Sequence, residues 1–208
     1  MRRTKLEKFT ASLCVLDIIA GVVLASGISE GTFHTDPFKM FTVLNALWAL
    51  LYYLLELRWL QIGGRGFLST GMRFTVMVNS AGMAVISLLY LGPMHASFGG
   101  TDYLALLLLQ YLLPLLMILD WLVGPKNYFR KKHILYAMIL PLLYNAAALI
   151  LGTLGFGIGL DGAQYPYPFL HVDQLGWGIV LANIGMIMVG QYFFCRIWVW
   201  LDRLGSRR

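Results

Sequence analysis

The chain has 208 residues, of which 59% are hydrophobic and 12% charged, against roughly 45–50% and 25% in soluble domains. This composition excludes a soluble globular protein. The formal net charge is +6, but the basic residues lie at the ends of apolar runs and form no basic face interleaved with aromatic residues. The charge therefore argues against a nucleic-acid-binding protein.

Six apolar runs each approach the length of about 20 residues that a helix needs to cross a bilayer. In chain order they cover 9–27, 40–60, 74–92, 103–123, 134–155 and 176–199. They leave no room for a soluble domain, so we predict an all-α polytopic membrane protein: one bundle of six transmembrane helices over residues 1–208. The first run also resembles a signal peptide, but its length and Asp17 favour a retained helix.

The basic residues fall on alternate sides of the predicted spans. All sixteen Lys and Arg residues except Lys39 lie at the N-terminus, near the links after the second and fourth runs, or near the C-terminus. Lys and Arg close to the ends of spans stay on the cytoplasmic side of the membrane. The pattern therefore predicts that both termini are cytoplasmic.

Polar side chains within spans are costly in lipid, so they usually face the bundle interior and mark a site. At a rise of ~1.5 Å per residue, such groups from five spans lie in the outer half of the bundle or near its midplane. They are Asp17, Thr42, Asn45, Gln110, Tyr144, Asn145 and Asn183. We expect an outward-opening pocket between the second, fourth, fifth and sixth spans, lined by Thr42, Asn45, Gln110, Asn145 and Asn183. The alternative is that these groups only hydrogen-bond helices to one another.

Three carboxylates lie inside the apolar runs. Asp17 comes near the midplane, where no Lys or Arg shares its depth, so we expect it to be neutral at pH 7. Glu56 and Asp120 lie within a few residues of the inner boundary. The basic side chains within their reach are Arg58, Arg73 and Lys126. We expect these groups to form ion pairs that snorkel to the boundary.

Pro114 and Pro141 lie inside the fourth and fifth runs. Each removes a backbone hydrogen bond and can kink its helix. We expect such kinks to widen the bundle near Gln110 and Asn145. The alternative is that they have no special role, because proline is common in membrane helices.

The sequence predicts no cofactor and no metal site. A b-type haem needs axial histidines inside spans, but the four histidines lie in links or at the inner boundary: His34, His95, His133 and His171. No outer histidine has metal-ligand spacing to a neighbouring acid, and no Lys lies inside a span to form a retinal Schiff base. Cys14 and Cys195 lie inside apolar runs, so we expect packing residues without a disulfide.

Two stretches carry a resemblance to a known family. The chain reads YPYPFLHVDQLG over 165–176, and the fourth run contains QYLLP at 110–114 and LDWL at 119–122, followed by GPK at 124–126. With Phe41-Thr42 at the start of the second run, these stretches resemble the bacterial six-span branch of the androgen-induced-gene (FAR-type) membrane family, also called Pr-six-Pr proteins. In order and spacing of runs, the similarity covers nearly the whole chain.

The resemblance implies a location in a bacterial inner membrane and an intramembrane hydrolase for fatty acid esters of hydroxy fatty acids. Such enzymes use a threonine on helix two, matched here by Thr42, and a histidine on helix four. Gln110 stands at the histidine position, and an amide cannot take the threonine proton as a general base does. His171 stands where bacterial relatives have Asp, and it is a candidate replacement base if it folds over the pocket.

Two hypotheses follow, and both make membrane lipids or a lipid-like substrate the expected partner. The first is a threonine hydrolase for lipid esters, or a degenerate relative of one; the second is a non-enzymatic lipid-binding or transport bundle. A channel is a weaker third, because the sequence has no charged ring or filter. A histidine within ~3 Å of Thr42 Oγ1, or one water away, discriminates between them. The sequence does not indicate substrate identity, protein partners or oligomeric state.

Overall fold

A computed structural model describes residues 5–64, 67–90 and 100–205. His95 lies outside this part of the chain, as do five of the basic residues used to predict the orientation: Arg2, Arg3, Arg65, Arg207 and Arg208. The described part is helical, without strands. It contains six helices that are long and apolar enough to cross a membrane. The predicted all-α integral membrane protein is thus confirmed.

The six spans follow the six apolar runs. They are α1 (Lys5–Ala25), α2 (Phe41–Gln61), α3 (Thr70–Tyr90), the continuous series α5 (Gly100–Leu107), η3 (Leu108–Leu112) and α6 (Leu113–Val123), then α7 (Lys131–Thr153) and α8 (Val172–Leu204). Short 3-10 turns lie in the links: η1 (Ile28–Glu30), η2 (Asp36–Lys39), η4 (Leu160–Gly162) and η5 (Pro168–Leu170). Most spans begin a few residues before their apolar run, because helical bonding continues into the polar boundary residues.

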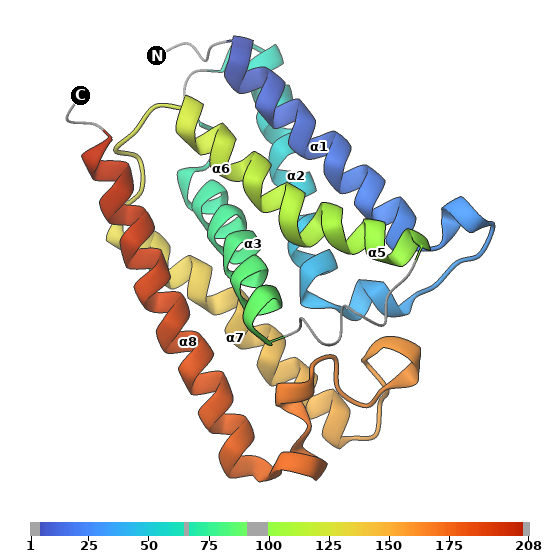
Figure 1. The fold of residues 1–208 in the computed structure, drawn as a ribbon. Helices are drawn as coiled ribbons and strands as arrows, with labels where there is room; N and C mark the ends of the chain where they lie inside the picture. Colours follow the sequence, from blue (N-terminus) through green and yellow to red (C-terminus); the bar gives the residue numbers. More distant parts are fainter. Residues whose placement is uncertain (1–4, 65–66, 91–99, 206–208) are drawn as a thin grey trace.

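Helix α3 lies at the centre of the bundle (Figure 1). It contacts α2, α6, α7 and α8, whereas α1 packs against α2, α5 and α6 on one side. In the most apolar segment of α3, 67% of the residues are buried, against 17% in that of α8. The surface of α8 is therefore mostly available to lipid. Figure 1 also places the start of α1 and the end of α8 at the same end of the bundle, called the terminal end below.

Close approach between α1 and the fourth span depends on Gly21. A Cβ atom at Gly21 would lie 2.5 Å from the Leu109 side chain in η3. Small residues at such positions let membrane helices pack closely. Helix α1 is thus an integral part of the bundle, as expected for a retained helix.

The link between α7 and α8 folds back onto the bundle. Tyr165 is buried, and its ring packs so closely on Gly152 of α7 that a Cβ there would lie 2.3 Å away. Lys39 connects this link to the link between α1 and α2, because its Nζ donates to the Gly157 carbonyl at 3.2 Å and to Asp36 at 2.7 Å. The hydrogen bond from Lys39 lowers the pKa of Asp36. The stretch with the family-like sequence is therefore part of the packed structure.

A buried ion pair lies toward the terminal end. Arg73 Nη2 contacts Asp120 Oδ2 at 2.7 Å, and both side chains are almost fully buried. The same carboxylate accepts from the hydroxyls of Thr10 at 2.8 Å and Tyr53 at 3.4 Å. Helices α1, α2, α3 and α6 thus meet at one carboxylate. Of the ion pairs expected for Glu56 and Asp120 with Arg58, Arg73 and Lys126, the pair of Arg73 with Asp120 is present.

The expectation that these groups snorkel to the boundary is wrong. Glu56 is fully buried, and its Oε2 accepts from the backbone N–H of Leu68 at 2.7 Å. Lys126 lies over the Trp121 ring and donates to the carbonyls of Trp121, Leu122 and Gly124 at the end of α6. Neighbouring helices enclose Glu56, Arg73 and Asp120, whereas Arg58 is exposed and Lys126 is half-buried. Depth along one helix does not predict whether neighbouring helices cover a residue.

Asp202 of α8 fixes the link between α6 and α7. Its carboxylate accepts from Trp121 Nε1 at 2.9 Å and from the backbone N–H of Phe129 at 2.8 Å, while its carbonyl accepts from Asn127 N–H at 3.1 Å. Phe129 in turn packs on Phe74 of α3, with 4.9 Å between ring centroids. The link is therefore well ordered despite its lack of regular structure.

Candidate binding site

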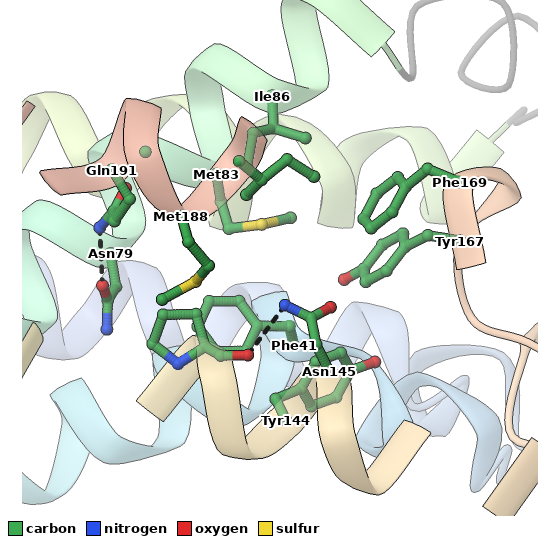
Figure 2. A pocket seen from close by; sticks show the side chains of 13 residues that line it. Phe41, Asn79, Met83, Ile86, Tyr144, Asn145, Tyr167, Phe169, Met188 and Gln191 are labelled. Atoms are coloured by element: carbon green, nitrogen blue, oxygen red, sulfur yellow. Dashed lines mark hydrogen bonds between the residues drawn. The ribbon is translucent and has the colours of Figure 1, made fainter. Parts of the chain in front are cut away.

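A cavity of about 40 Å³ lies among α2, α3, α7, α8 and the link before α8 (Figure 2). Its lining residues are Phe41, Asn79, Gly82, Met83, Ile86, Pro141, Tyr144, Asn145, Tyr167, Phe169, Ile187, Met188 and Gln191. Figure 2 shows Asn79 and Gln191 at one end, Tyr167 and Phe169 at the other, and the methionines between them. The described lining is apolar with a few neutral polar groups and no charged residue.

The polar end of the cavity near α8 is an amide pair. Gln191 Nε2 donates to Asn79 Oδ1 at 3.0 Å, and this leaves Asn79 Nδ2 buried without a hydrogen bond. The absence of a side chain at Gly82 makes the pair possible, because a Cβ there would lie 2.5 Å from Gln191 Oε1. One amide donor is therefore left over beside the cavity.

The other end contains two tyrosines. Tyr144 donates to the Lys39 carbonyl at 3.0 Å, whereas the buried hydroxyl of Tyr167 makes no hydrogen bond within the described chain. Burial raises the pKa of Tyr167 to about 12, although the nearby Thr42 hydroxyl and the N–H groups of Phe41 and Thr42 oppose that rise. Tyr167 thus links the cavity to the buried first turn of α2.

Thr42 and Gln110 are brought together, as the resemblance implied. Gln110 Nε2 donates to Thr42 Oγ1 at 3.3 Å, and Ser87 of α3 donates to Gln110 Oε1. The Gln110 amide thus uses both its nitrogen and its oxygen in hydrogen bonds, and the atom that faces Thr42 is the donor Nε2. Gln110 positions the threonine but cannot accept its proton.

The backbone around Gln110 is π-helical over Leu108–Leu112. Pro114 lacks an N–H and its ring crowds the carbonyl four residues earlier, and a wider turn relieves both constraints. Such turns often occur at functional sites. The irregularity expected near Gln110 is therefore present, whereas α7 continues as a helix through Pro141.

The remaining predicted site residues have separate partners. Asn45 Nδ2 donates to Ser80 Oγ at 2.8 Å, Asn145 Nδ2 to the Pro141 carbonyl at 2.9 Å, and Asn183 Nδ2 to the Phe169 carbonyl at 3.3 Å. Both carboxylate oxygens of Asp17 are buried without a hydrogen bond in the described chain. The neutrality of Asp17 stays a prediction.

The 40 Å³ cavity gathers only part of the predicted set. Tyr144 and Asn145 line it; the other predicted residues are not among its lining. Helices two, five and six contribute as expected, but α3 takes the place of the fourth span, because α3 is the central helix. Asn79, Gln191 and Tyr167 were missed. The first two are amides inside apolar runs, so the rule applied to Asn145 would have found them.

None of the described histidines hydrogen-bonds to Thr42. His34 contacts Thr32, and His133 Nδ1 accepts from the Arg130 N–H. His171 packs on the Tyr165 ring with 5.3 Å between centroids, and it is not among the residues lining the cavity. His95 lies outside the described residues.

Comparisons of the chain with protein families, curated proteins and solved structures find no match. The resemblance to the androgen-induced-gene family therefore stays a prediction.

Proposed function

We propose that the protein binds a neutral, carbonyl-bearing amphiphile, such as a lipid ester, with its polar group in the 40 Å³ cavity. The observation that carries this proposal is the pair of buried donors beside the cavity, Asn79 Nδ2 and the Tyr167 hydroxyl, which make no hydrogen bond in the described chain.

The unmatched donors define the chemistry of the ligand. A buried donor without a partner costs about 1–3 kcal/mol. A carbonyl or ester oxygen accepts hydrogen bonds without bringing a charge, and the described lining offers no group to neutralise a charge. The ligand is therefore an uncharged acceptor.

The size of the cavity limits what enters it. About 40 Å³ admits a small polar group or a chain end but not a whole lipid. Met83, Ile86 and Met188 give the cavity apolar, adaptable walls. The acyl chains of the ligand consequently extend beyond the cavity into the bilayer.

Two neighbouring tyrosines provide a matched test. Tyr165 and Tyr167 are both buried, and the hydroxyl of each makes no hydrogen bond in the described chain, but only Tyr167 lines the cavity. Lipids that co-purify with each variant in detergent are measured by mass spectrometry. We expect Tyr167→Phe to reduce the retained neutral ester about 3–10-fold, since one hydrogen bond contributes roughly 0.5–1.5 kcal/mol. Tyr165→Phe should retain it. Equal retention by both variants would contradict the proposal.

Ester hydrolysis by Thr42 is the second candidate. It is supported by the position of Thr42 in the buried first turn of α2, beside the Tyr167 hydroxyl and next to Gln110. Free N–H groups at a helix start, with a phenol, are suited to stabilise the oxyanion of a tetrahedral intermediate. The described chain lacks a base hydrogen-bonded to Thr42, so we expect little hydrolysis by the wild type.

Substitution of Gln110 tests this second candidate. If Thr42 is correctly placed, Gln110→His should raise the hydrolysis of hydroxy-fatty-acid esters, because a general base typically contributes about 10²–10⁴-fold. Thr42→Ala in the same background should abolish the gain. Robust wild-type turnover that Thr42→Ala removes would show that another group activates the threonine. No activity in any variant would leave binding as the function.

We also propose a bacterial inner-membrane location with both termini in the cytoplasm, from the distribution of basic residues. The two native cysteines are free and buried, so single introduced cysteines can report sidedness. Asp102→Cys should react with an impermeant maleimide from outside intact cells, whereas Lys131→Cys should react only after permeabilisation. The reverse pattern would invert the topology.

A further inference from the structure

A second, wider hollow of about 520 Å³ lies at the terminal end of the bundle. It is lined by Thr70, Lys126, Asn127, Tyr128, Arg130, Lys132 and His133. Three of these residues are basic and none is acidic. The hollow is thus basic, whereas the 40 Å³ cavity is neutral. A ligand site in the hollow does not depend on the function proposed for the cavity.

Two helices begin at this hollow. Thr70 is the first residue of α3, and Lys132 lies in the first turn of α7. The first N–H groups of a helix lack acceptors within the helix, and its dipole is positive at this end. His133 Nδ1 accepts from the Arg130 N–H, so Nε2 carries the proton of the neutral ring. The helix dipoles and the imidazole N–H therefore add to the side-chain charges.

The loop that carries the basic residues is held in place before any ligand binds. Asp202 accepts from the N–H groups of Asn127 and Phe129, and both oxygens of its carboxylate are engaged. Tyr128 packs edge-on against Phe67 with 5.1 Å between centroids. Lys126 is fixed by the carbonyls at the end of α6. Arg130 and Lys132 remain exposed to solvent.

The hollow lies at the edge of the apolar band. Helix α6 ends at Val123 and α7 begins at Lys131, and both belong to candidate membrane spans. Leu135 and Tyr136, one turn further along α7, are exposed apolar side chains suited to lipid contact. This depth corresponds to the headgroup layer, where basic pockets between helices bind anionic lipids.

We propose that this hollow binds a phosphate group that is not paired with a cationic amine, as in the headgroup of an anionic phospholipid. Free inorganic phosphate has the same chemistry and is the other possible source. Arg130 and Lys132 supply exposed cationic donors, and the starts of α3 and α7 supply a fixed positive potential.

The test uses the full chain in a neutral detergent, where no anionic surface attracts basic residues in general. Retained lipid is measured by native mass spectrometry with phosphatidylglycerol, with phosphatidylcholine, and with millimolar inorganic phosphate as a competitor. The double variant Arg130→Gln/Lys132→Gln removes two charges from the hollow. The matched double variant Lys8→Gln/Lys131→Gln removes two exposed charges at the same end that do not line it.

We expect wild type to retain phosphatidylglycerol saturably and in preference to phosphatidylcholine. The hollow variant should lose affinity at least about tenfold, as expected for charge-assisted hydrogen bonds, while the matched variant should change less than about twofold. Inorganic phosphate that displaces phosphatidylglycerol from wild type, but not from the hollow variant, would identify free phosphate as a second ligand of the same site. Equal losses in the two double variants, or no preference between the lipids, would overturn the proposal. Both variants should keep the wild-type unfolding midpoint without lipid, because the substituted side chains are exposed.

Discussion

The terminal end of the bundle and its opposite half both bury polar side chains, but of different kinds. Toward the terminal end the buried groups are charged, and Arg73, Asp120 and Asp202 are engaged by several partners each. Around the 40 Å³ cavity the groups are neutral amides and hydroxyls, and Asn79 Nδ2 and the Tyr167 hydroxyl make no hydrogen bond in the described chain.

This difference distinguishes buried polar groups that stabilise the fold from buried polar groups that are available to a ligand. A buried charge is tolerated only when its partner and hydrogen bonds are all present, so the charged groups have no capacity left for a ligand. An amide or hydroxyl can remain partly unsatisfied at a smaller cost. In the neutral half the unsatisfied groups of Asn79 and Tyr167 line a cavity, so a neutral ligand gains most by binding there.

The largest expected effect follows removal of the central carboxylate. Asp120→Ala should lower the free energy of unfolding by about 3–5 kcal/mol, because it leaves Arg73 buried without its counter-ion. Unfolding in detergent, followed by circular dichroism, measures this loss. The double variant Arg73→Met/Asp120→Leu should recover most of the stability, since apolar replacements need no partner. A loss below about 1 kcal/mol would show that the pair is not structural.

Asp202→Ala should cost about 2–4 kcal/mol, because it leaves the Trp121 indole and the Phe129 N–H without their acceptors. It should also speed hydrogen exchange at the Phe129 amide. Asp173→Ala, at an exposed position of α8, is the matched control and should change stability little. If both variants behave alike, Asp202 does not fix the link.

A pair of glycines tests the packing around the cavity. Gly82→Ala should displace Gln191 and break its bond to Asn79, since the new Cβ would lie 2.5 Å from Oε1. Gly178→Ala meets open space on α8 and should stabilise the helix slightly. We expect Gly82→Ala to be about 1–2 kcal/mol less stable than Gly178→Ala. Equal stability would contradict the placement of the amide pair.

The smallest effect is expected at Asp17. Asp17→Asn should change the unfolding midpoint little, because a buried carboxyl without a partner in the described chain favours its neutral form, which asparagine resembles. The midpoint is measured at pH 7 in detergent. A large loss would indicate a charged, paired Asp17.

The spans were predictable from the sequence because hydrophobicity over about 20 residues determines membrane insertion. The contact between Thr42 and Gln110 followed from the resemblance. The direction in which each polar side chain points did not follow, because depth along a helix fixes no direction around its axis. Asn45 points to α3, and Asn183 points to the link between α7 and α8. Tyr167 was missed as a site residue because it lies in a link that folds back into the bundle, which no local pattern reports.

One measurement tests directly whether the 40 Å³ cavity binds the neutral ester and whether the buried pair of Arg73 and Asp120 is purely structural. The unfolding midpoint of delipidated protein is compared with and without a neutral ester, such as a monoacylglycerol, in wild type, in Tyr167→Phe and in Arg73→Met/Asp120→Leu. The ester should raise the midpoint of wild type and of the double variant, because a ligand that binds only the folded state stabilises it. Tyr167→Phe should start at or above the wild-type midpoint, since it removes an unsatisfied hydroxyl, yet respond least to the ester. An undiminished response in Tyr167→Phe, or a response lost only in the double variant, would contradict this account.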